Sequence, residues 1–168
     1  YYTVFNSEQC KGIEVPATET PRATFSPIEL CENVVNGYAK PPIIEPRHSY
    51  AFYRPSVDLV GMPKPERFDT PEDYYGVLFH ELGHSTGHAS RLARKRVMEC
   101  SVFASNDYSK EELVAEMSSA FLSGHCGTEN KLIDNSANYV GSWLKNLKDD
   151  PKLVVQAGAQ AQTATDYI

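Results

Sequence analysis

The sequence lacks several features that would place it in common protein classes. It has no run of apolar residues long enough to cross a bilayer and no secretory signal, so we expect no contact with a membrane. Its four cysteines are widely spaced and include no C-x-x-C pair, which argues against a disulfide framework and against a zinc knuckle. Free thiols of this kind are typical of a reducing compartment, and we therefore expect a cytoplasmic protein.

Positive charge is also scarce. Lysine and arginine number 16 against 22 aspartates and glutamates, and the net charge of −6 argues against a surface that grips nucleic acid through its phosphates. One basic cluster stands out, and we expect it to be the solvated end of a helix, where cations suit the helix dipole. Its members are Arg91, Arg94, Lys95 and Arg96.

An initiator methionine is missing too, and the chain opens directly on the strand-like residues 1–6. We therefore expect the C-terminal part of a longer protein. A chain of 168 residues is long enough for one domain with its own core, and we expect residues 1–168 to form a single domain.

Helical and extended patterns along the chain predict an α+β fold. The first helix is expected to be capped by Ser26, with Pro27 at its first position, and to stop at Gly37. Short strands at residues 43–44, 50–53 and 57–60 predict a small, mostly antiparallel sheet, with residues 57–60 as an edge to which an extended peptide can add. Later helices are expected from Thr70 to a left-handed cap at Gly87, and at residues 111–122, 136–148 and 150–168.

The most informative stretch is H-E-x-x-H at residues 80–84, inside a mostly apolar helical segment. Residues four apart lie one turn apart on the same face of a helix, so His80 and His84 can direct two imidazole nitrogens at one ion. Glu81 lies beside that face, close enough to reach a water at the metal without being a ligand. Because buried histidines and carboxylates are costly unless they coordinate or pair, the apolar surroundings favour a metal site.

A catalytic zinc ion needs three protein ligands, so one more must come from elsewhere in the chain. The helix expected at residues 111–122 carries Glu112 and Glu116 one turn apart on an apolar background. A glutamate ligand is typically followed four positions later by a residue that hydrogen-bonds a ligand histidine, which predicts Glu112 as the ligand and Glu116 as that partner. Ser109 offers an alternative, because it can cap the helix and draw Glu112 back, leaving Glu116 as the ligand.

A third histidine follows the motif, but its spacing does not suit a ligand. In the pattern H-E-x-x-H-x-x-G-x-x-H the last histidine would fall at Ser90, and His88 comes two residues earlier. On a continued helix, His88 would point about 80° away from His80. We expect His88 to cap or pack at the end of the helix.

These residues predict a metallopeptidase. Zn²⁺ held by His80, His84 and Glu112 would polarise the scissile carbonyl and lower the pKa of water, and Glu81 would act as the general base that passes the proton to the leaving amine. The expected substrate is a protein or peptide, although a non-peptide amide is an open alternative.

Four motifs along the chain are distinctive when taken together: YTVFN at residues 2–6, HELGHSTGH at residues 80–88, YSKEELVAE at residues 108–116 and WLKNLK at residues 143–148. They resemble the zincin-like metallopeptidase domain of ArdC-type antirestriction proteins. The resemblance spans essentially the whole chain.

The resemblance implies a two-part parent protein from a conjugative plasmid or another mobile element, which protects incoming DNA from host restriction. A domain that binds single-stranded DNA would precede this one, so DNA contact is expected there and not here. The alternative function is a non-catalytic module in which the metal only stabilises the fold, while the parent protein acts by coating single-stranded DNA.

Overall fold

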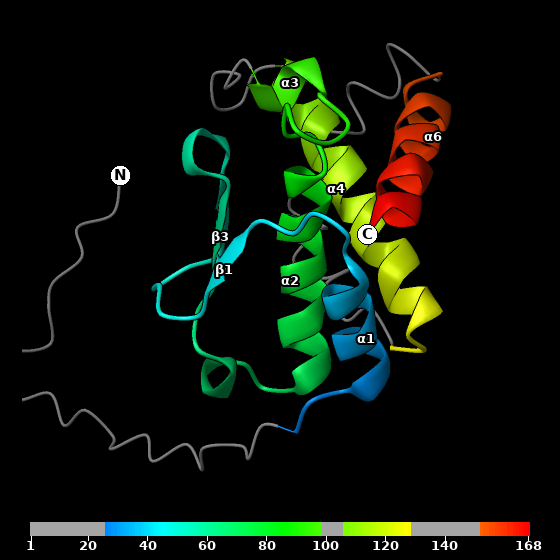
Figure 1. Ribbon diagram of the computed structural model, residues 1–168. Coiled ribbons are helices and arrows are strands. Elements are labelled where there is room, and N and C mark those ends of the chain that lie inside the picture. Colours follow the sequence, from blue (N-terminus) through cyan, green and yellow to red (C-terminus); the bar gives the residue numbers. More distant parts are fainter. Residues whose placement is uncertain (1–25, 99–105, 129–151) are drawn as a thin grey trace, which may run out of the picture.

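The computed structural model describes residues 26–98, 106–128 and 152–168. Helices and one small sheet form the α+β fold that the sequence predicts (Figure 1). The strand expected at residues 1–6 and the helix expected at residues 136–148 lie outside the described residues. In chain order the elements are α1 (Glu29–Gly37), β1 (Ile43–Glu45), β2 (Phe52–Arg54), η2 (Pro55–Val57), β3 (Leu59–Gly61), η3 (Pro65–Arg67), α2 (Pro71–Ser85), α3 (Lys95–Met98), α4 (Asn106–His125) and α6 (Lys152–Tyr167).

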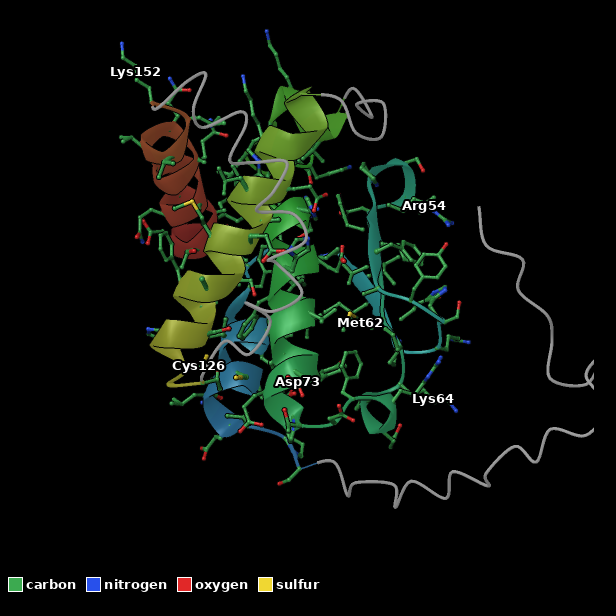
Figure 2. All side chains as sticks on the ribbon, turned by 180° about the vertical axis from the view of Figure 1, so that it is seen from behind. Arg54, Met62, Lys64, Asp73, Cys126 and Lys152 are labelled. Carbon is green, nitrogen blue, oxygen red and sulfur yellow. The ribbon has the colours of Figure 1, made fainter. Side chains whose placement is uncertain are left out.

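Helix α2 lies at the centre of the arrangement. The sheet covers one side of α2, α1 and α4 lie on the other, and α6 packs against α4 (Figure 1). Tyr75, Phe79 and Leu82 of α2 are fully buried in the main core. Figure 2 shows the molecule from behind, with Met62 directed from the sheet toward α2 and Arg54 directed away from it. The helix with the H-E-x-x-H motif is therefore held from both sides.

The sheet is mixed, with the strand order β1-β3-β2. β1 runs parallel to β3, and β2 runs antiparallel to it. The sheet is thus not mostly antiparallel, and residues 57–60 do not form an edge. The reason is that the chain returns from β2 into the space beside β1, so that both hydrogen-bonding edges of β3 are used. Among the described strands, the free edges belong to β1 and β2.

The start of α2 is fixed by its capping residues, as the sequence predicts. Thr70 Oγ1 accepts a hydrogen bond from the backbone N–H of Asp73, whose carboxylate accepts one from the backbone N–H of Thr70. Pro71 occupies the first helical position, where its missing N–H has no cost.

The end of α2 is close to the predicted position, but Gly87 is not a left-handed cap. The helix ends at Ser85, and the residue in the cap position, Thr86, is right-handed. Gly87 serves close packing, because a Cβ there would lie 2.4 Å from Val97 Cγ2 and 3.1 Å from Arg94 Cζ. Any side chain at this position would push away the segment that follows α2.

Helix α1 begins later than predicted. Its N-cap is Ile28, in an extended conformation and without a side-chain cap, so the capping box expected at Ser26 does not form. Pro27 therefore precedes the helix. The helix ends at Gly37 as predicted, and its Cys31 is fully buried in the main core.

Helix α4 begins at Asn106, five residues earlier than predicted, and ends at His125. Ser109 consequently lies inside the helix and not at its N-cap, so the helix start no longer argues for Glu116 as the ligand. The first turn of α4 thus precedes the glutamates, and residues 111–116 lie in a regular part of the helix.

Helices α2 and α4 approach each other closely at Gly83. A Cβ at Gly83 would lie 3.2 Å from Ser118 Cβ and 3.3 Å from the Cα atom of Ala115. Ser119 adds a hydrogen bond of 2.7 Å from its Oγ to the carbonyl oxygen of Gly76. This close packing brings the acidic residues of α4 within reach of the histidines of α2. Within the described ranges, the helices include none that is long and apolar enough to span a membrane.

Candidate metal centre

The two histidines of the H-E-x-x-H motif point to a common place between α2 and α4. The Nε2 atoms of His80 and His84 lie 3.1 Å apart, because the two residues are one turn apart on the same face of α2. Their side chains are only 16% and 14% exposed. Both rings therefore present the same nitrogen atom to one partly buried point.

Glu112 of α4 supplies the third group at this point. Its Oε2 lies 3.5 Å from Nε2 of His80, and its Oε1 lies 3.4 Å from Nε2 of His84. Two ligand atoms bonded to one tetrahedral zinc ion at about 2.0–2.1 Å lie roughly 3.3–3.4 Å apart. The spacing and the chemistry of the three side chains therefore fit a divalent metal ion, and they form a group whose ligand atoms lie within 4.8 Å of one another.

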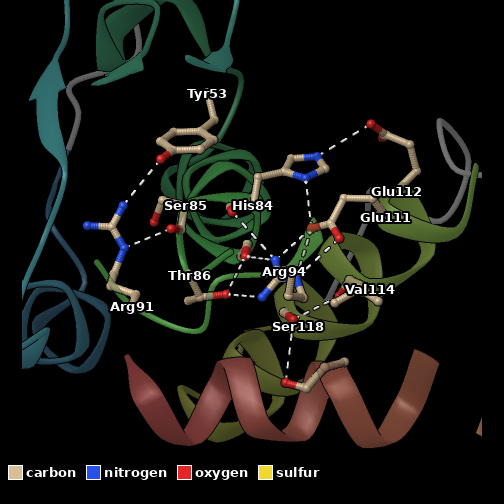
Figure 3. Close-up of polar contacts among 12 residues, drawn as sticks. Tyr53, His84, Ser85, Thr86, Arg91, Arg94, Glu111, Glu112, Val114 and Ser118 are labelled. Atoms are coloured by element: carbon tan, nitrogen blue, oxygen red, sulfur yellow. Dashed lines mark hydrogen bonds and ion pairs between the residues drawn. The ribbon is translucent and has the colours of Figure 1, made fainter. Parts of the chain in front are cut away.

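The second nitrogen of each histidine faces a different glutamate of α4. Nδ1 of His80 lies 3.6 Å from Oε1 of Glu116, and Nδ1 of His84 lies 3.6 Å from Oε1 of Glu111. Figure 3 shows His84 between its two carboxylates. Such partners select the tautomer of a histidine and fix its ring orientation. Glu116, which the sequence predicts as the partner of a ligand histidine, thus lies beside His80.

The carboxylates change the proton affinity of the metal-free site. Burial alone would lower the pKa of His84, but hydrogen bonds with Glu111 and Glu112 outweigh it and raise the pKa to about 10. Burial alone would raise the pKa of Glu112, but its hydrogen bonds with His80 and His84 hold the pKa below its usual range. The site therefore concentrates negative charge around two imidazoles, which suits a cation.

Glu81 lies beside the histidines on α2, on the side that faces β2. Its side chain is buried, and the residue is 9% exposed. Burial raises the pKa of Glu81, although the neighbouring His80 and His84 and a backbone hydrogen bond from Tyr53 of β2 act in the opposite direction. A carboxyl group with a raised pKa close to a metal site is suited to taking up and releasing a proton.

His88 lies outside this group, as the sequence predicts. Its Nδ1 lies 2.8 Å from Ser90 Oγ and also accepts a hydrogen bond from the backbone N–H of Ser90. The histidine therefore stabilises the turn after α2.

The two arginines after α2 do not form the solvated helix end that the sequence suggested. The side chain of Arg91 is 1% exposed and pairs with Asp58, while that of Arg94 is 10% exposed and pairs with Glu111. Figure 3 shows both arginines turned toward the end of α2. Buried cations need partners, and each arginine has an acid from another element to pair with.

Sequence reasoning missed Glu111 and Arg94 as parts of this site. The only signal in the sequence was that Glu111 directly precedes the predicted ligand on an apolar helix. The sequence contains no signal for Arg94, because the number of residues between it and Glu111 matches neither the period of a helix nor that of a strand.

Comparison with known proteins agrees with these features. The model of the zincin-like metallopeptidase family matches residues 38–160. DNA primase TraC of Escherichia coli is 38% identical over 168 residues, which are 100% of this chain and 15% of TraC.

Two solved structures of the antirestriction ArdC protein from the R388 plasmid are also similar. The Mn(II)-bound structure shares 34% identity with a TM-score of 0.69, over 99% of this chain and 60% of that chain. The metal-free structure shares 33% identity with a TM-score of 0.65, over 99% and 58%. The chain thus spans less than two thirds of the length of each of these relatives.

Proposed function

Because the chain belongs to the zincin-like metallopeptidase family and has a zincin-like fold, we propose that it hydrolyses peptide bonds with one divalent metal ion held by His80, His84 and Glu112. The observation that carries this proposal is the convergence of the three side chains, with separations of 3.1, 3.4 and 3.5 Å between their ligand atoms. Glu112 is favoured over Glu116 as the ligand because its carboxylate lies beside the two facing Nε2 atoms, whereas Glu116 lies beside an outward Nδ1.

The general base in this proposal is Glu81. A divalent ion at the site would polarise a carbonyl group and lower the pKa of water. The Glu81 carboxylate takes a proton from water at one of its oxygen atoms and gives it to the nitrogen of the leaving amine. Burial supports the first step, because a carboxyl group with a raised pKa takes up a proton more readily than an exposed one.

We propose zinc as the metal of the working protein. Two imidazoles and one carboxylate are a common donor set for catalytic zinc. A relative binds Mn(II) in its crystal structure, and nitrogen and carboxylate ligands also accept manganese. Metal analysis of protein purified without added metal distinguishes the two ions.

The substrate is proposed to be a protein or peptide that binds along β2. Among the described strands, β2 leaves one edge unpaired, and the backbone N–H of Tyr53 is directed toward Glu81. An extended peptide added to this edge would place its backbone beside the general base. β2 therefore replaces residues 57–60 as the candidate binding edge.

An antirestriction role in a protein from a conjugative or mobile element is proposed from the ArdC likeness. In the alternative, the metal only ties α2 to α4, and the parent protein acts through a separate domain that binds single-stranded DNA. The burial of Glu81 beside the metal ligands favours catalysis, because a site that is only structural has no use for a buried carboxyl group that is not a ligand.

Replacement of Glu81 tests the two functions against each other. Glu81→Gln is expected to bind Mn(II) or Zn²⁺ as the wild type does, while its rate of hydrolysis of a pool of fluorogenic peptides falls by roughly 10²–10⁴-fold. Glu66→Gln, an exposed acid on η3, is the control and is expected to keep full activity. A wild-type protein that binds metal but cleaves no peptide, or a Glu81→Gln variant with unchanged activity, would contradict the peptidase proposal.

A further inference from the structure

Arg94 connects the end of α2 with the metal-facing side of α4. Its Nη1 donates to Thr86 Oγ1 over 2.6 Å, and its Nη2 donates to the carbonyl oxygen of Gly83 over 2.8 Å. The same guanidinium donates to both carboxylate oxygens of Glu111, with distances of 3.1 and 3.2 Å from Nε and 2.6 Å from Nη2 (Figure 3). The planar guanidinium therefore holds acceptors from α2, from the residue that follows it and from α4 in one fixed arrangement.

Glu111 connects Arg94 with one of the two histidines. It is 6% exposed, and its Oε1 lies 3.6 Å from Nδ1 of His84. The opposite nitrogen of that ring, Nε2, faces Glu112 over 3.4 Å. A carboxylate fixed at Nδ1 keeps the proton on that nitrogen and leaves the Nε2 lone pair for a metal ion.

We propose that Arg94 is a positioning residue of the metal site, which clamps Glu111 so that His84 presents Nε2 to the ion. The inference rests on the metal site of the proposed function and not on peptide hydrolysis. Without Arg94, Glu111 would be a buried carboxylate that has lost its bidentate partner, and it would turn away or take up a proton. In either case the ring of His84 would lose the group that sets its tautomer.

Arg91 provides a matched control on the same segment. It is also buried, donates a hydrogen bond of 2.7 Å from Nε to the carbonyl oxygen of Ser85, and pairs with Asp58. Arg91 therefore connects the end of α2 with the sheet, as Arg94 connects the end of α2 with α4. Within the described part of the chain, however, the hydrogen bonds of its side chain go to Ser85, Lys40, Asp58 and Tyr53, and to none of the proposed metal ligands or their glutamate partners.

The test compares Arg94→Met with Arg91→Met by titration with Mn(II), using the EPR signal of free Mn(II) to measure the Kd. Arg94→Met is expected to raise the Kd by about 10–100-fold, as is common when an outer partner of a ligand histidine is lost. Arg91→Met is expected to lower the stability in urea and to leave the Kd of the folded protein within about twofold, because its contacts do not reach the ligands.

Two further variants keep the test decisive. If Arg94→Met does not fold, Arg94→Lys is used. It is expected to raise the Kd by at least about fivefold, because one ammonium group cannot make the bidentate hydrogen bonds of a planar guanidinium. Adding Glu111→Gln to the Arg94 variant is expected to raise the Kd little further, because both changes break the same connection. An unchanged Kd for Mn(II) in a folded Arg94 variant would overturn the inference. So would a rise of the Kd in Arg91→Met that equals the rise in Arg94→Met.

The same titration separates this inference from the proposed function. A wild type that binds Mn(II) and cleaves no peptide contradicts the peptidase, while the inference is judged on the Arg94 variants alone. A wild type that binds neither Mn(II) nor Zn²⁺ overturns both.

Discussion

Glu111, Glu112 and Glu116 lie close together on α4, yet each faces a different part of the histidine pair. Glu112 lies beside both Nε2 atoms, whereas Glu116 and Glu111 each lie beside one Nδ1. The sequence predicts the places of Glu112 and Glu116, because a spacing of four keeps both on one face of a helix. It does not predict that of Glu111, which depends on where Arg94 reaches after the chain has folded.

The pair between Asp58 and Arg91 makes a prediction about pH. Burial alone would raise the pKa of Asp58, but hydrogen bonds from Arg91 and Tyr53 outweigh it and lower the pKa, with a smaller effect from His88. A carboxyl group with a lowered pKa in the folded state stabilises the protein above its ordinary pKa of about 3.9. That stabilisation is lost as the pH falls further, through the pKa of the folded state.

We therefore expect Asp58→Asn to lower the free energy of unfolding at pH 7 by roughly 2–4 kcal/mol, because it leaves a buried guanidinium without its charged partner. The difference from the wild type should stay constant above about pH 5 and shrink below it. Urea unfolding of the chelator-treated proteins at several pH values measures this, with the exposed Asp69→Asn as control. A difference that grows toward acid pH would contradict the assignment.

At the scale of elements, the helix α2 is well predicted and the helix α4 is not. The start of α2 is determined by the neighbouring residues Thr70, Pro71 and Asp73, and the structure contains the capping box of Thr70 and Asp73. The sequence predicts a start of α4 that is too late, because Asn106 and Asp107 favour turns as well as first helical turns. Local propensity does not decide between these two uses.

The close approach of α2 and α4 makes Gly83 a critical position. A Cβ there would lie 3.3 Å from the backbone of Ala115, which cannot rotate away as a side chain can. Gly83→Ala is thus expected to shift α4, to lower the free energy of unfolding by about 1–2 kcal/mol, and to weaken Mn(II) binding severalfold.

Gly124→Ala is the control for this change. Gly124 also lies in a helix, but a Cβ there would meet no atom within 4 Å. Its substitution should be neutral or stabilise the protein by up to about 1 kcal/mol, because alanine is the better helix former. Thermal unfolding and metal titration measure both variants, and equal effects at the two glycines would refute the role of close packing.

At the scale of the whole molecule, the general architecture could be predicted but not the order of the strands. The sequence indicated a small sheet against an H-E-x-x-H helix and a later helix with a third carboxylate. It could not show that β3 pairs on both sides, because the period of a strand reveals its faces and not its neighbours. The burial of Arg91 was missed for the same reason, since its partner Asp58 lies 33 residues earlier.

The proposed metal ligands come from two helices, so metal binding should stabilise the fold as a whole. A metal at 100 times its Kd is expected to raise the free energy of unfolding by about 2.7 kcal/mol, and a chelator should reverse this. Because the pKa of metal-free His84 is raised to about 10, binding should also release a proton and become tighter as the pH rises.

Calorimetric titration in two buffers with different heats of ionisation measures the released protons, and a thermal scan with and without EDTA measures the stabilisation. Glu112→Ala is expected to lose both responses. A variant that keeps the full thermal shift would show that the metal is held elsewhere.

The small size of the sheet has a consequence for how the proposed activity would be lost on unfolding. Three strands of three residues each are too short to persist by themselves, and Val60 of β3 is completely buried in the core that α2 shares. Melting α2 would therefore disperse the strands and the histidines in a single cooperative step. The rate of the proposed peptide hydrolysis should then fall in proportion to the folded fraction along a denaturant series, with no partly active species between the folded and unfolded states.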